Sequence, residues 1–234
     1  MTARTVLVTG GNRGIGLATA HLLAEAGHRV SVTYRTDPPP GLHAVRCDVT
    51  STEEVDAAFT EVEQRHGPIE VLVSNAGITD DQLLLRMSEQ SFTGVLDTNL
   101  TGAYRVAKRA SRGMLKNRWG RLLFVSSVVG LSGATGQANY AASKAGLVGL
   151  SRSLARELGG RGITSNVVAP GYVDTDMTAG LPEARRVELL ATIPAGRTAS
   201  PEEIAHVLAF LASAQAGYVN GAVVPVDGGL GMGH

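Results

Sequence analysis

Residues 9–16 read Thr9-Gly-Gly-Asn-Arg-Gly-Ile-Gly16 and directly follow the apolar run Thr5-Val-Leu-Val8. Gly10 permits a tight turn from a strand into a helix, Gly14 lets backbone N–H groups approach a pyrophosphate, and Gly16 lets the helix pack closely on the strand. The glycine string alone is a weak signal, but its place after the first strand of an alternating chain predicts a dinucleotide-binding turn. The alternative is a glycine-rich turn without a ligand.

The rest of the chain alternates short β-branched apolar runs with longer amphipathic stretches, a pattern typical of βαβ units and of a parallel sheet buried on both faces. We therefore predict an α/β fold over residues 1–234, a single-domain Rossmann-like three-layer α/β/α sandwich with a seven-stranded parallel sheet. Strands are expected at residues 5–9, 29–33, 43–47, 70–74, 121–126, 164–168 and 223–226, and helices at 14–26, 52–66, a pair across 89–116, 140–158 and 201–212. The longest irregular insert, residues 172–196, is expected to lie on the substrate side as a lid.

The composition excludes several classes of partner and site. The 21 Lys and Arg balance the 21 Asp and Glu, so the chain lacks the basic footprint of a nucleic-acid binder. No segment reaches the ~18 apolar residues of a membrane span, so no membrane insertion is expected. The six histidines contain no i, i+3 or i, i+4 pair, so no metal site is expected. The single cysteine, Cys47, suits a reducing compartment and predicts a cytoplasmic protein.

The end of the second strand indicates which dinucleotide binds. An acidic residue there bonds the ribose 2′-hydroxyl of NAD, but here Tyr34 and Arg35 end the strand. Asp37 is an argument for NAD, yet it leads into three prolines, so we interpret it as a turn residue. Arg13 and Arg35 can pair a 2′-phosphate through their guanidinium groups, which favours NADP. The alternative is that both arginines are solvated surface residues.

Two Tyr-x-x-x-Lys pairs occur, Tyr104 with Lys108 and Tyr140 with Lys144. On a helix this spacing places both side chains on one face, where the ammonium stabilises phenolate and lowers the tyrosine pKa toward working pH. Tyr140 follows a strand that ends in serines and then a glycine-rich loop, so we expect it at the carboxyl edge of the sheet, where ligands bind. Tyr104 lies within a long amphipathic stretch. We therefore predict that Tyr140 and Lys144 are catalytic and that Tyr104 packs.

Further motifs carry a family resemblance. They are Cys47-Asp-Val-Thr50, Asn75-Ala-Gly77, Asn99-Leu-Thr-Gly102, Ser127-Val-Val-Gly130, Gly136-Gln-Ala-Asn-Tyr-Ala-Ala-Ser-Lys-Ala-Gly146, Asn166-Val-Val-Ala-Pro-Gly171 and Val226-Asp-Gly-Gly229. Together with the glycine turn, they make the chain resemble, over essentially its whole length, the short-chain dehydrogenase/reductases. Within that family it resembles the β-ketoacyl-[acyl-carrier-protein] reductases of the FabG type, and most of all their actinobacterial members.

The resemblance implies NADPH-dependent reduction of a 3-oxoacyl thioester, bound to acyl carrier protein, to the 3-hydroxyacyl thioester in fatty-acid biosynthesis. Tyr140 would protonate the carbonyl oxygen, while Lys144 would hold the nicotinamide ribose and lower the Tyr140 pKa. Ser127 would orient the substrate oxygen, and its spacing to Tyr140 favours it over Ser126. Asn99 would anchor a proton-relay water beside Lys144. The family also implies a homotetramer, in which two long helices pair across one interface and residues 229–234 lie near another.

The resemblance also assigns binding residues. The cofactor is expected to contact Gly10, Asn12, Arg13, Gly14, Ile15, Gly16, Arg35, Asp48, Val49, Asn75, Ala76, Gly77, Tyr140, Lys144, Pro170, Gly171, Val173 and Thr175. Among these, Asn75 is expected to be the most structural. The substrate and carrier are expected to contact Ser127, Ser132, Arg118 and Arg161, with solvated arginines as the alternative for the last two.

One departure from the family pattern and two other functions complete the prediction. Ser132 stands in the loop where the long-chain mycolate member carries a tryptophan, so a preference for very long acyl chains is not expected. The first alternative is reduction of another carbonyl, such as a CoA thioester, a polyketide or a small ketone, which carrier-dependent turnover would discriminate. The second is a non-catalytic NADPH-binding sensor. The intact catalytic set argues against the sensor, which has no chemical need for all four residues.

Overall fold

The computed structural model describes residues 2–175 and 183–232 of the chain. In these residues the strands form one seven-stranded sheet in the order β3-β2-β1-β4-β5-β6-β7, and every neighbouring pair is parallel. The strands are β1 (Thr5–Thr9), β2 (Arg29–Tyr34), β3 (His43–Arg46), β4 (Val71–Ser74), β5 (Gly120–Val125), β6 (Ile163–Pro170) and β7 (Val223–Val226). The helices are α1 (Gly14–Glu25), α2 (Thr52–His66), α3 (Glu89–Leu96), α4 (Gly102–Asn117), α5 (Val129–Ser132), α6 (Ala138–Leu158), α7 (Glu183–Thr192) and α8 (Pro201–Ala212), with a π-helical turn at Asp97–Thr101 and 3₁₀ turns at Leu84–Arg86 and Gly159–Arg161.

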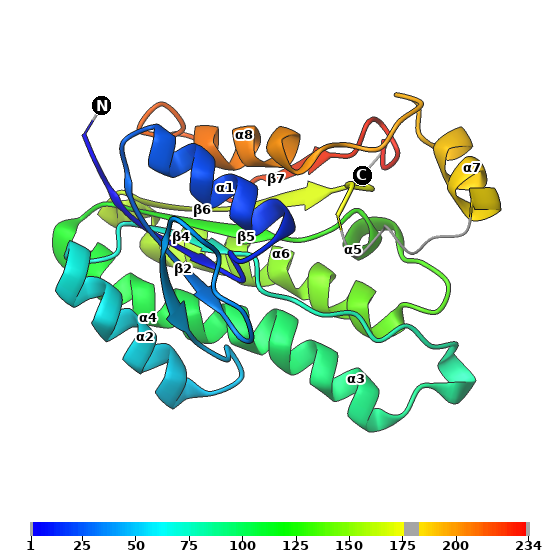
Figure 1. Ribbon diagram of the computed structural model, residues 1–234, viewed down its shortest axis with the longest axis horizontal. Coiled ribbons are helices and arrows are strands. Elements are labelled where there is room, and N and C mark those ends of the chain that lie inside the picture. The colour runs from blue at the N-terminus through cyan, green and yellow to red at the C-terminus, as the bar shows by residue number, and fades with distance from the viewer. Residues whose placement is uncertain (1, 176–182, 233–234) are drawn as a thin grey trace.

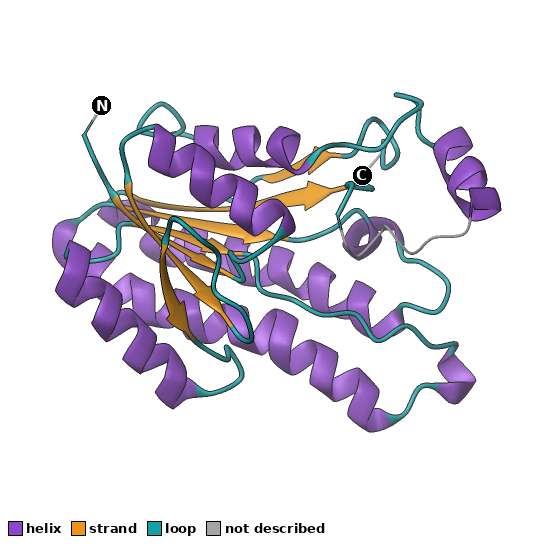
Figure 2. Ribbon diagram, viewed as in Figure 1, coloured by secondary structure: helices purple, strands orange, loops and turns teal. Residues whose placement is uncertain are grey.

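Helices cover both faces of the sheet, with α1 and α8 on one face and α2, α4 and α6 on the other (Figures 1 and 2). Successive side chains of a strand point to opposite faces, so both sets must be apolar. In β1, Val6 and Val8 belong to the core cluster shared with α1 and α8, whereas Leu7 belongs to the cluster shared with α2 and α4. The three-layer sandwich with seven parallel strands that the sequence predicts is therefore confirmed.

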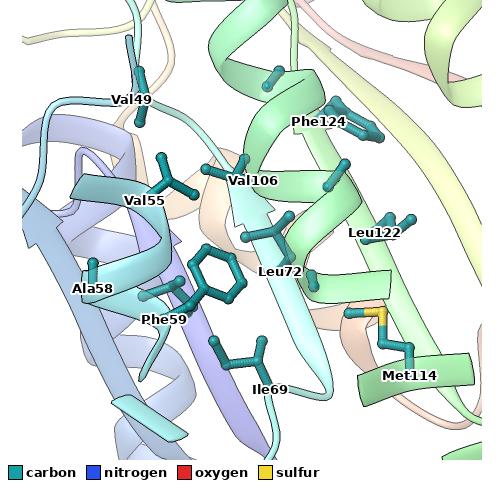
Figure 3. Close-up of a cluster of buried hydrophobic side chains, with 14 of the residues drawn as sticks. Val49, Val55, Ala58, Phe59, Ile69, Leu72, Val106, Met114, Leu122 and Phe124 are labelled. Atoms are coloured by element: carbon teal, nitrogen blue, oxygen red, sulfur yellow. The ribbon is translucent and has the colours of Figure 1, made fainter. Parts of the chain in front are cut away.

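The cluster beneath α2 and α4 contains the largest buried side chains (Figure 3). The ring of Phe59 from α2 points toward Leu72 of β4 and Val106 of α4, and all three are at most 1% exposed. Phe124 of β5 extends the same cluster along the sheet and is fully buried. This packing fixes α2 and α4 against the strands whose carboxyl ends carry the polar loops.

The strand order reverses between β1 and β4. From β1 the sheet grows through β2 and β3 on one side, and from β4 through β5, β6 and β7 on the other. Connections that leave such a switch point in opposite directions open a crevice at the carboxyl edge, where ligands of open α/β sheets bind. Thr9 and Ser74 are register partners at this point, and they are followed by the glycine turn and by Asn75.

Two segments differ from the sequence-based expectation. Residues 172–196 were expected to be irregular, but they contain helix α7, and residues 176–182 of that insert lie outside the described residues. Leu189 and Ile193 are spaced i, i+4 and are both buried, a helical signal that the sequence already carries. The expected glycine-rich loop after β5 begins with the short helix α5.

Because Leu72 lies in the buried core, we expect its truncation to lower the stability of the protein strongly. Leu72 is 0% exposed, and its replacement by Ala should lower the free energy of unfolding by about 2–5 kcal/mol, because buried methyl groups are lost and a cavity remains. Leu85→Ala is the matched control, since Leu85 is 99% exposed and its truncation should change stability by less than about 0.5 kcal/mol. Urea denaturation followed by circular dichroism measures both. Equal losses in the two variants would contradict this account of the core.

Candidate active site

A cavity of about 570 Å³ lies at the carboxyl edge of the sheet and takes its walls from the loops that follow β1, β2, β3, β4, β5 and β6. It is within the size range of small-molecule and cofactor sites. Its wall includes these residues expected to bind a cofactor: Gly10, Asn12, Arg13, Gly14, Ile15, Arg35, Asp48, Val49, Asn75, Ala76, Gly77, Tyr140, Lys144, Pro170, Gly171, Val173 and Thr175. The crevice that the topology creates therefore coincides with the residues that the motifs indicate.

Gly16 does not line the wall but has a steric role. A Cβ at Gly16 would lie 2.5 Å from the Gly10 carbonyl oxygen and 2.6 Å from Nδ2 of Asn75, so only glycine lets α1 approach the turn. Gly10 has φ 61°, and its own Cβ would lie 2.9 Å from Cα of Ala76. Nδ2 of Asn75 donates to the carbonyls of Thr9 at 3.1 Å and Gly10 at 3.0 Å. Asn75 therefore braces the turn, as the sequence suggested.

The residues present fit a phosphorylated dinucleotide. The glycine turn leads into the N-terminus of α1, where free backbone N–H groups and the helix dipole favour a phosphate. A Cβ at Gly14 would occupy space next to Thr175, at 3.3 Å from its methyl carbon. The cavity wall carries positively charged side chains, contributed by Arg13, Arg35 and Lys144. Such a cleft would hold the pyrophosphate at the turn.

The part of the cavity wall that follows β2 and β3 contains both basic and acidic groups. Arg35 follows β2, and its carbonyl oxygen accepts a hydrogen bond from Nε of Arg46 at 3.3 Å. Asp37, which we interpreted as a turn residue, is exposed, lies beyond the end of β2 and also lines the cavity. The pKa of Asp48 is lowered, mainly because the backbone N–H of Thr50 donates to its carboxylate at 2.9 Å. Asp48 is therefore an anchored carboxylate in the wall beside Val49.

Tyr140 and Lys144 lie one turn apart on α6. Nζ of Lys144 is 5.6 Å from the centroid of the Tyr140 ring and donates to the Val125 carbonyl oxygen at 2.8 Å. The hydroxyl of Ser126 donates in turn to the backbone carbonyl of Lys144 at 2.9 Å. Two hydrogen bonds in opposite directions thus fasten this turn of α6 to the end of β5. Burial lowers the pKa of Lys144 to about 8.

The pKa of Tyr140 is raised. Burial of the phenol raises it, a hydrogen bond with Ser127 lowers it in part, and the Asp81 carboxylate raises it further. The expected lowering by Lys144 is not met in this structure, because desolvation outweighs the other influences on the phenol. Of the two neighbouring serines, Ser127 is the one whose side chain influences the pKa of the phenol, whereas the hydroxyl of Ser126 donates to the α6 backbone.

Asn99 lies behind the cavity wall in the π-helical turn Asp97–Thr101. Its Nδ2 donates to the Ile78 carbonyl at 2.9 Å and to the Ser143 hydroxyl at 3.0 Å, and its Oδ1 accepts the Ile78 N–H at 2.8 Å. A Cβ at Gly77 would lie 3.1 Å from this oxygen and 3.4 Å from Nζ of Lys144. Glycine at that position lets Asn99 and Lys144 share one small volume, but the Asn99 side chain is already engaged with protein groups.

The residues expected to meet substrate and carrier are more dispersed. Ser132 ends α5 and bonds the Val128 carbonyl at 3.1 Å, outside the cavity wall. Arg118 precedes β5, has φ 52° and donates to the Gly160 carbonyl at 3.4 Å. Arg161 ends the 3₁₀ turn before β6. Both arginines thus lie at the amino edge of the sheet, opposite the cavity, and the structure does not bring them to it.

Several cavity-wall residues were not among the predicted site residues. They include Thr33, Cys47, Ile78 and Thr98. Burial raises the pKa of Cys47 to about 12, so its thiol is protonated and unreactive at neutral pH. Thr33 is the next-to-last residue of β2 and Cys47 directly follows β3, and this position at the carboxyl edge is a signal that could have found them. Ile78 directly follows the Asn75-Ala-Gly77 motif and Thr98 directly precedes Asn99, so their place beside motifs is the signal for these two.

The other Tyr-x-x-x-Lys pair, Tyr104 with Lys108, lies on the protein surface and not in the cavity wall. The prediction that Tyr104 packs in the core is wrong: its side chain is 46% exposed on α4, with Nζ of Lys108 5.7 Å from its ring centroid. Both residues line a groove of about 410 Å³ between α4 and α6, away from the cavity.

No group of three or more His, Cys, Asp or Glu side chains among the described residues 2–175 and 183–232 could hold a metal ion. None of their helices has the length and apolar character needed to cross a membrane.

Comparison with known proteins places the chain in a family. The family model described as enoyl-(acyl carrier protein) reductase matches residues 10–231. The chain is 58% identical over 233 residues to the 3-oxoacyl-[acyl-carrier-protein] reductase MabA of Mycobacterium tuberculosis (strain H37Rv), across 99% of this chain and 94% of that protein. It is 56% identical to MabA of Mycobacterium avium, across 99% and 91%. It is 43% identical over 240 residues to the 3-oxoacyl-[acyl-carrier-protein] reductase FabG of Escherichia coli K12, across 98% of both chains. The chain therefore belongs to this reductase family within the short-chain dehydrogenase/reductases, the broad family that its motifs predict.

Proposed function

We propose that the protein uses NADPH to reduce a 3-oxoacyl thioester, carried by acyl carrier protein, to the 3-hydroxyacyl thioester in fatty-acid biosynthesis. One observation carries the proposal: the Tyr140 phenol and the buried Lys144 side chain lie together in the wall of a cleft that fits a phosphorylated dinucleotide. The relatives named above are reductases of this kind over nearly their whole length. When bound, NADPH supplies the hydride, and the protein supplies binding, orientation and a proton.

Tyr140 is the proton donor in this proposal. Because its pKa is raised, the phenol is protonated at neutral pH and can give a proton to the carbonyl oxygen as charge develops there. Ser127, whose side chain partly lowers the pKa of the phenol, orients the same carbonyl oxygen. The Lys144 ammonium holds the nicotinamide ribose and stabilises the phenolate that forms when the proton leaves. Asn99 supports this set by holding Ile78 and Ser143.

Arg13 and Arg35 are proposed to select NADP by pairing its 2′-phosphate. A guanidinium group suits phosphate because it donates two parallel, charge-assisted hydrogen bonds. Asp37 is the opposing influence, since its carboxylate would repel the same phosphate. Two arginines outweigh one exposed carboxylate in this balance.

The proposal extends to assembly, carrier and location. We propose a homotetramer in which the α4–α6 groove, with exposed Tyr104 and Leu115, pairs between protomers. Arg118 and Arg161 are proposed to contact the acidic carrier. Since these two arginines lie at the amino edge of the sheet, we propose that they contact a carrier that is bound at the cavity of a neighbouring protomer. Residues 1–234 are proposed to act as one domain in the cytoplasm, where the free thiol of Cys47 is stable.

Tyr140→Phe tests the reaction itself. Loss of the phenolic proton should lower kcat for acetoacetyl-CoA and for 3-oxoacyl carrier substrates by about 100-fold to 10,000-fold, with NADPH affinity little changed. Tyr104→Phe removes the same hydroxyl from the other Tyr-x-x-x-Lys pair and should leave kcat within about twofold. The fall in absorbance at about 340 nm, as NADPH is oxidised, measures kcat for both variants. Wild-type activity in Tyr140→Phe would exclude this mechanism.

Arg13→Ala/Arg35→Ala tests the choice of cofactor. Each lost charge-assisted hydrogen bond is worth about 1.5–3 kcal/mol, so the double variant should bind NADPH at least about 100-fold more weakly. NADH affinity should change by less than about threefold, because NADH has no 2′-phosphate. Fluorescence titration with both cofactors measures the ratio. A parallel loss for NADPH and NADH would contradict the proposed role.

The lowered pKa of Lys144 predicts an alkaline loss of activity. The ammonium form is present below the pKa of about 8 and is lost as the pH rises through it, so kcat/KM should fall above about pH 8. Tyr140, with its raised pKa, stays protonated over this range. Circular dichroism at each pH separates this effect from unfolding. A profile that stays flat from about pH 7 to about pH 9.5 would be incompatible with a required Lys144 ammonium.

A further inference from the structure

Asn139 directly precedes Tyr140 in the first turn of α6 and is 0% exposed. Its Nδ2 donates to the backbone carbonyl of Asp80 at 2.8 Å and reaches the hydroxyl of Ser91 at 3.4 Å. Its Oδ1 accepts the backbone N–H of Tyr140 at 2.8 Å, one of the N–H groups that have no partner within the helix. The amide therefore uses both of its ends, one on Tyr140 and the other on a segment distant in sequence.

That distant segment, residues 78–82, connects the π-helical turn that holds Asn99 to the start of α6, which holds Tyr140. At one end Asn99 exchanges two hydrogen bonds with the backbone of Ile78. At the other end the N–H of Gln82 donates to the Gly136 carbonyl at 2.8 Å, and Nε2 of Gln137 donates to the Asp81 carboxylate at 2.7 Å. At this second end, the bond from Asn139 to the Asp80 carbonyl comes from a buried side chain, whereas Gln137 is partly exposed.

We propose that Asn139 is a positioning residue for Tyr140: it fixes the start of α6 against segment 78–82 and so sets where the phenol stands relative to Ser127 and Lys144. The inference rests on the proposed function, since it concerns the proton donor of that reaction. Asn139 is not part of the cavity wall, so it acts through Tyr140 and not by touching a ligand.

An amide is the side chain that this position requires. It must donate to a carbonyl and accept an N–H at the same time, which carboxylate and alanine cannot do. Its loss would leave the Asp80 carbonyl and the Tyr140 N–H without partners, and the first turn of α6 would shift or fray to find new ones. A displacement of about 1 Å at a reacting group can cost about 100-fold in rate. Segment 78–82 also carries Asp81, whose carboxylate influences the phenol, so its release would change the electrostatics of Tyr140.

Asn166 provides a matched control. It is also 0% exposed, its Nδ2 donates to the Val219 carbonyl at 2.8 Å, and its Oδ1 accepts the Ala222 N–H at 3.0 Å. It lies in β6 and joins that strand to residues 219–222, remote from Tyr140 in the described fold. Asn139→Ala and Asn166→Ala thus delete the same buried amide and the same two kinds of hydrogen bond.

The experiment compares kcat with acetoacetyl-CoA, the dissociation constant for NADPH and the thermal midpoint in the wild type and both variants. We expect both variants to lose stability, but only Asn139→Ala to lose kcat, by about 10-fold to 100-fold. NADPH affinity should stay within about threefold in Asn139→Ala, because no cavity contact is lost. Equal effects of the two variants on kcat, or a loss in Asn139→Ala that is confined to NADPH binding, would overturn the proposal.

A second variant covers the case in which Asn139→Ala does not fold. Asn139→Asp keeps the volume and the acceptor for the Tyr140 N–H but loses the donor to Asp80. It should still lower kcat by at least about 10-fold, whereas wild-type kcat in this variant would overturn the proposal. Failure of the proposed function is distinct, because the wild type itself would then show no thioester reduction.

Discussion

Burial of the parallel sheet on both faces is the constraint on which the site depends. Neither face meets water, so most interior strand positions are apolar, and Leu72, Leu122 and Leu123 are all fully buried. The polar groups that line the cavity are gathered where the strands end. At the carboxyl edge the ladder of backbone hydrogen bonds stops, and the freed carbonyl of Val125 accepts the Lys144 ammonium. The last residue of β5 thus supplies the hydrogen-bond acceptor for the buried Lys144 side chain.

Hydrogen bonding around the cavity is nearly complete, which makes the site pre-organised. Lys144, Asn99 and Asn139 are buried polar side chains, and each has protein partners. Among the described residues, the buried side-chain atoms without a partner are Nε2 of His66 and Oγ1 of Thr164. These residues end α2 and begin β6, away from the carboxyl edge. Unsatisfied polar groups are therefore kept out of the region where the proposed chemistry needs fixed geometry.

The sequence predicts the strands well because β-branched runs are required for burial on both faces. It also predicts the glycine turn, since positive φ at Gly10 and the close approach of Gly16 leave few other residue types possible. The raised pKa of Tyr140 could not be predicted from the i, i+4 pair, because it depends on burial and on Asp81, which lies far earlier in the chain. The bond between Asn139 and Asp80 is likewise long-range and leaves no local pattern. Helix α7 was missed although Leu189 lies within it and Ile193 follows it at helical spacing, because prolines and glycines on either side indicate turns.

The two Tyr-x-x-x-Lys pairs separate what spacing does from what environment does. In both pairs the lysine nitrogen lies at nearly the same distance from the ring centroid, 5.6 Å for Lys144 and 5.7 Å for Lys108. Helix geometry therefore gives the same pairing twice, and pairing by itself does not create reactivity. Around Tyr140, desolvation makes a small change in charge energetically large, whereas exposed Tyr104 meets a solvent that screens it. What distinguishes the candidate catalytic pair is its place at the end of a buried strand, so the chemistry follows from the fold that surrounds the motif.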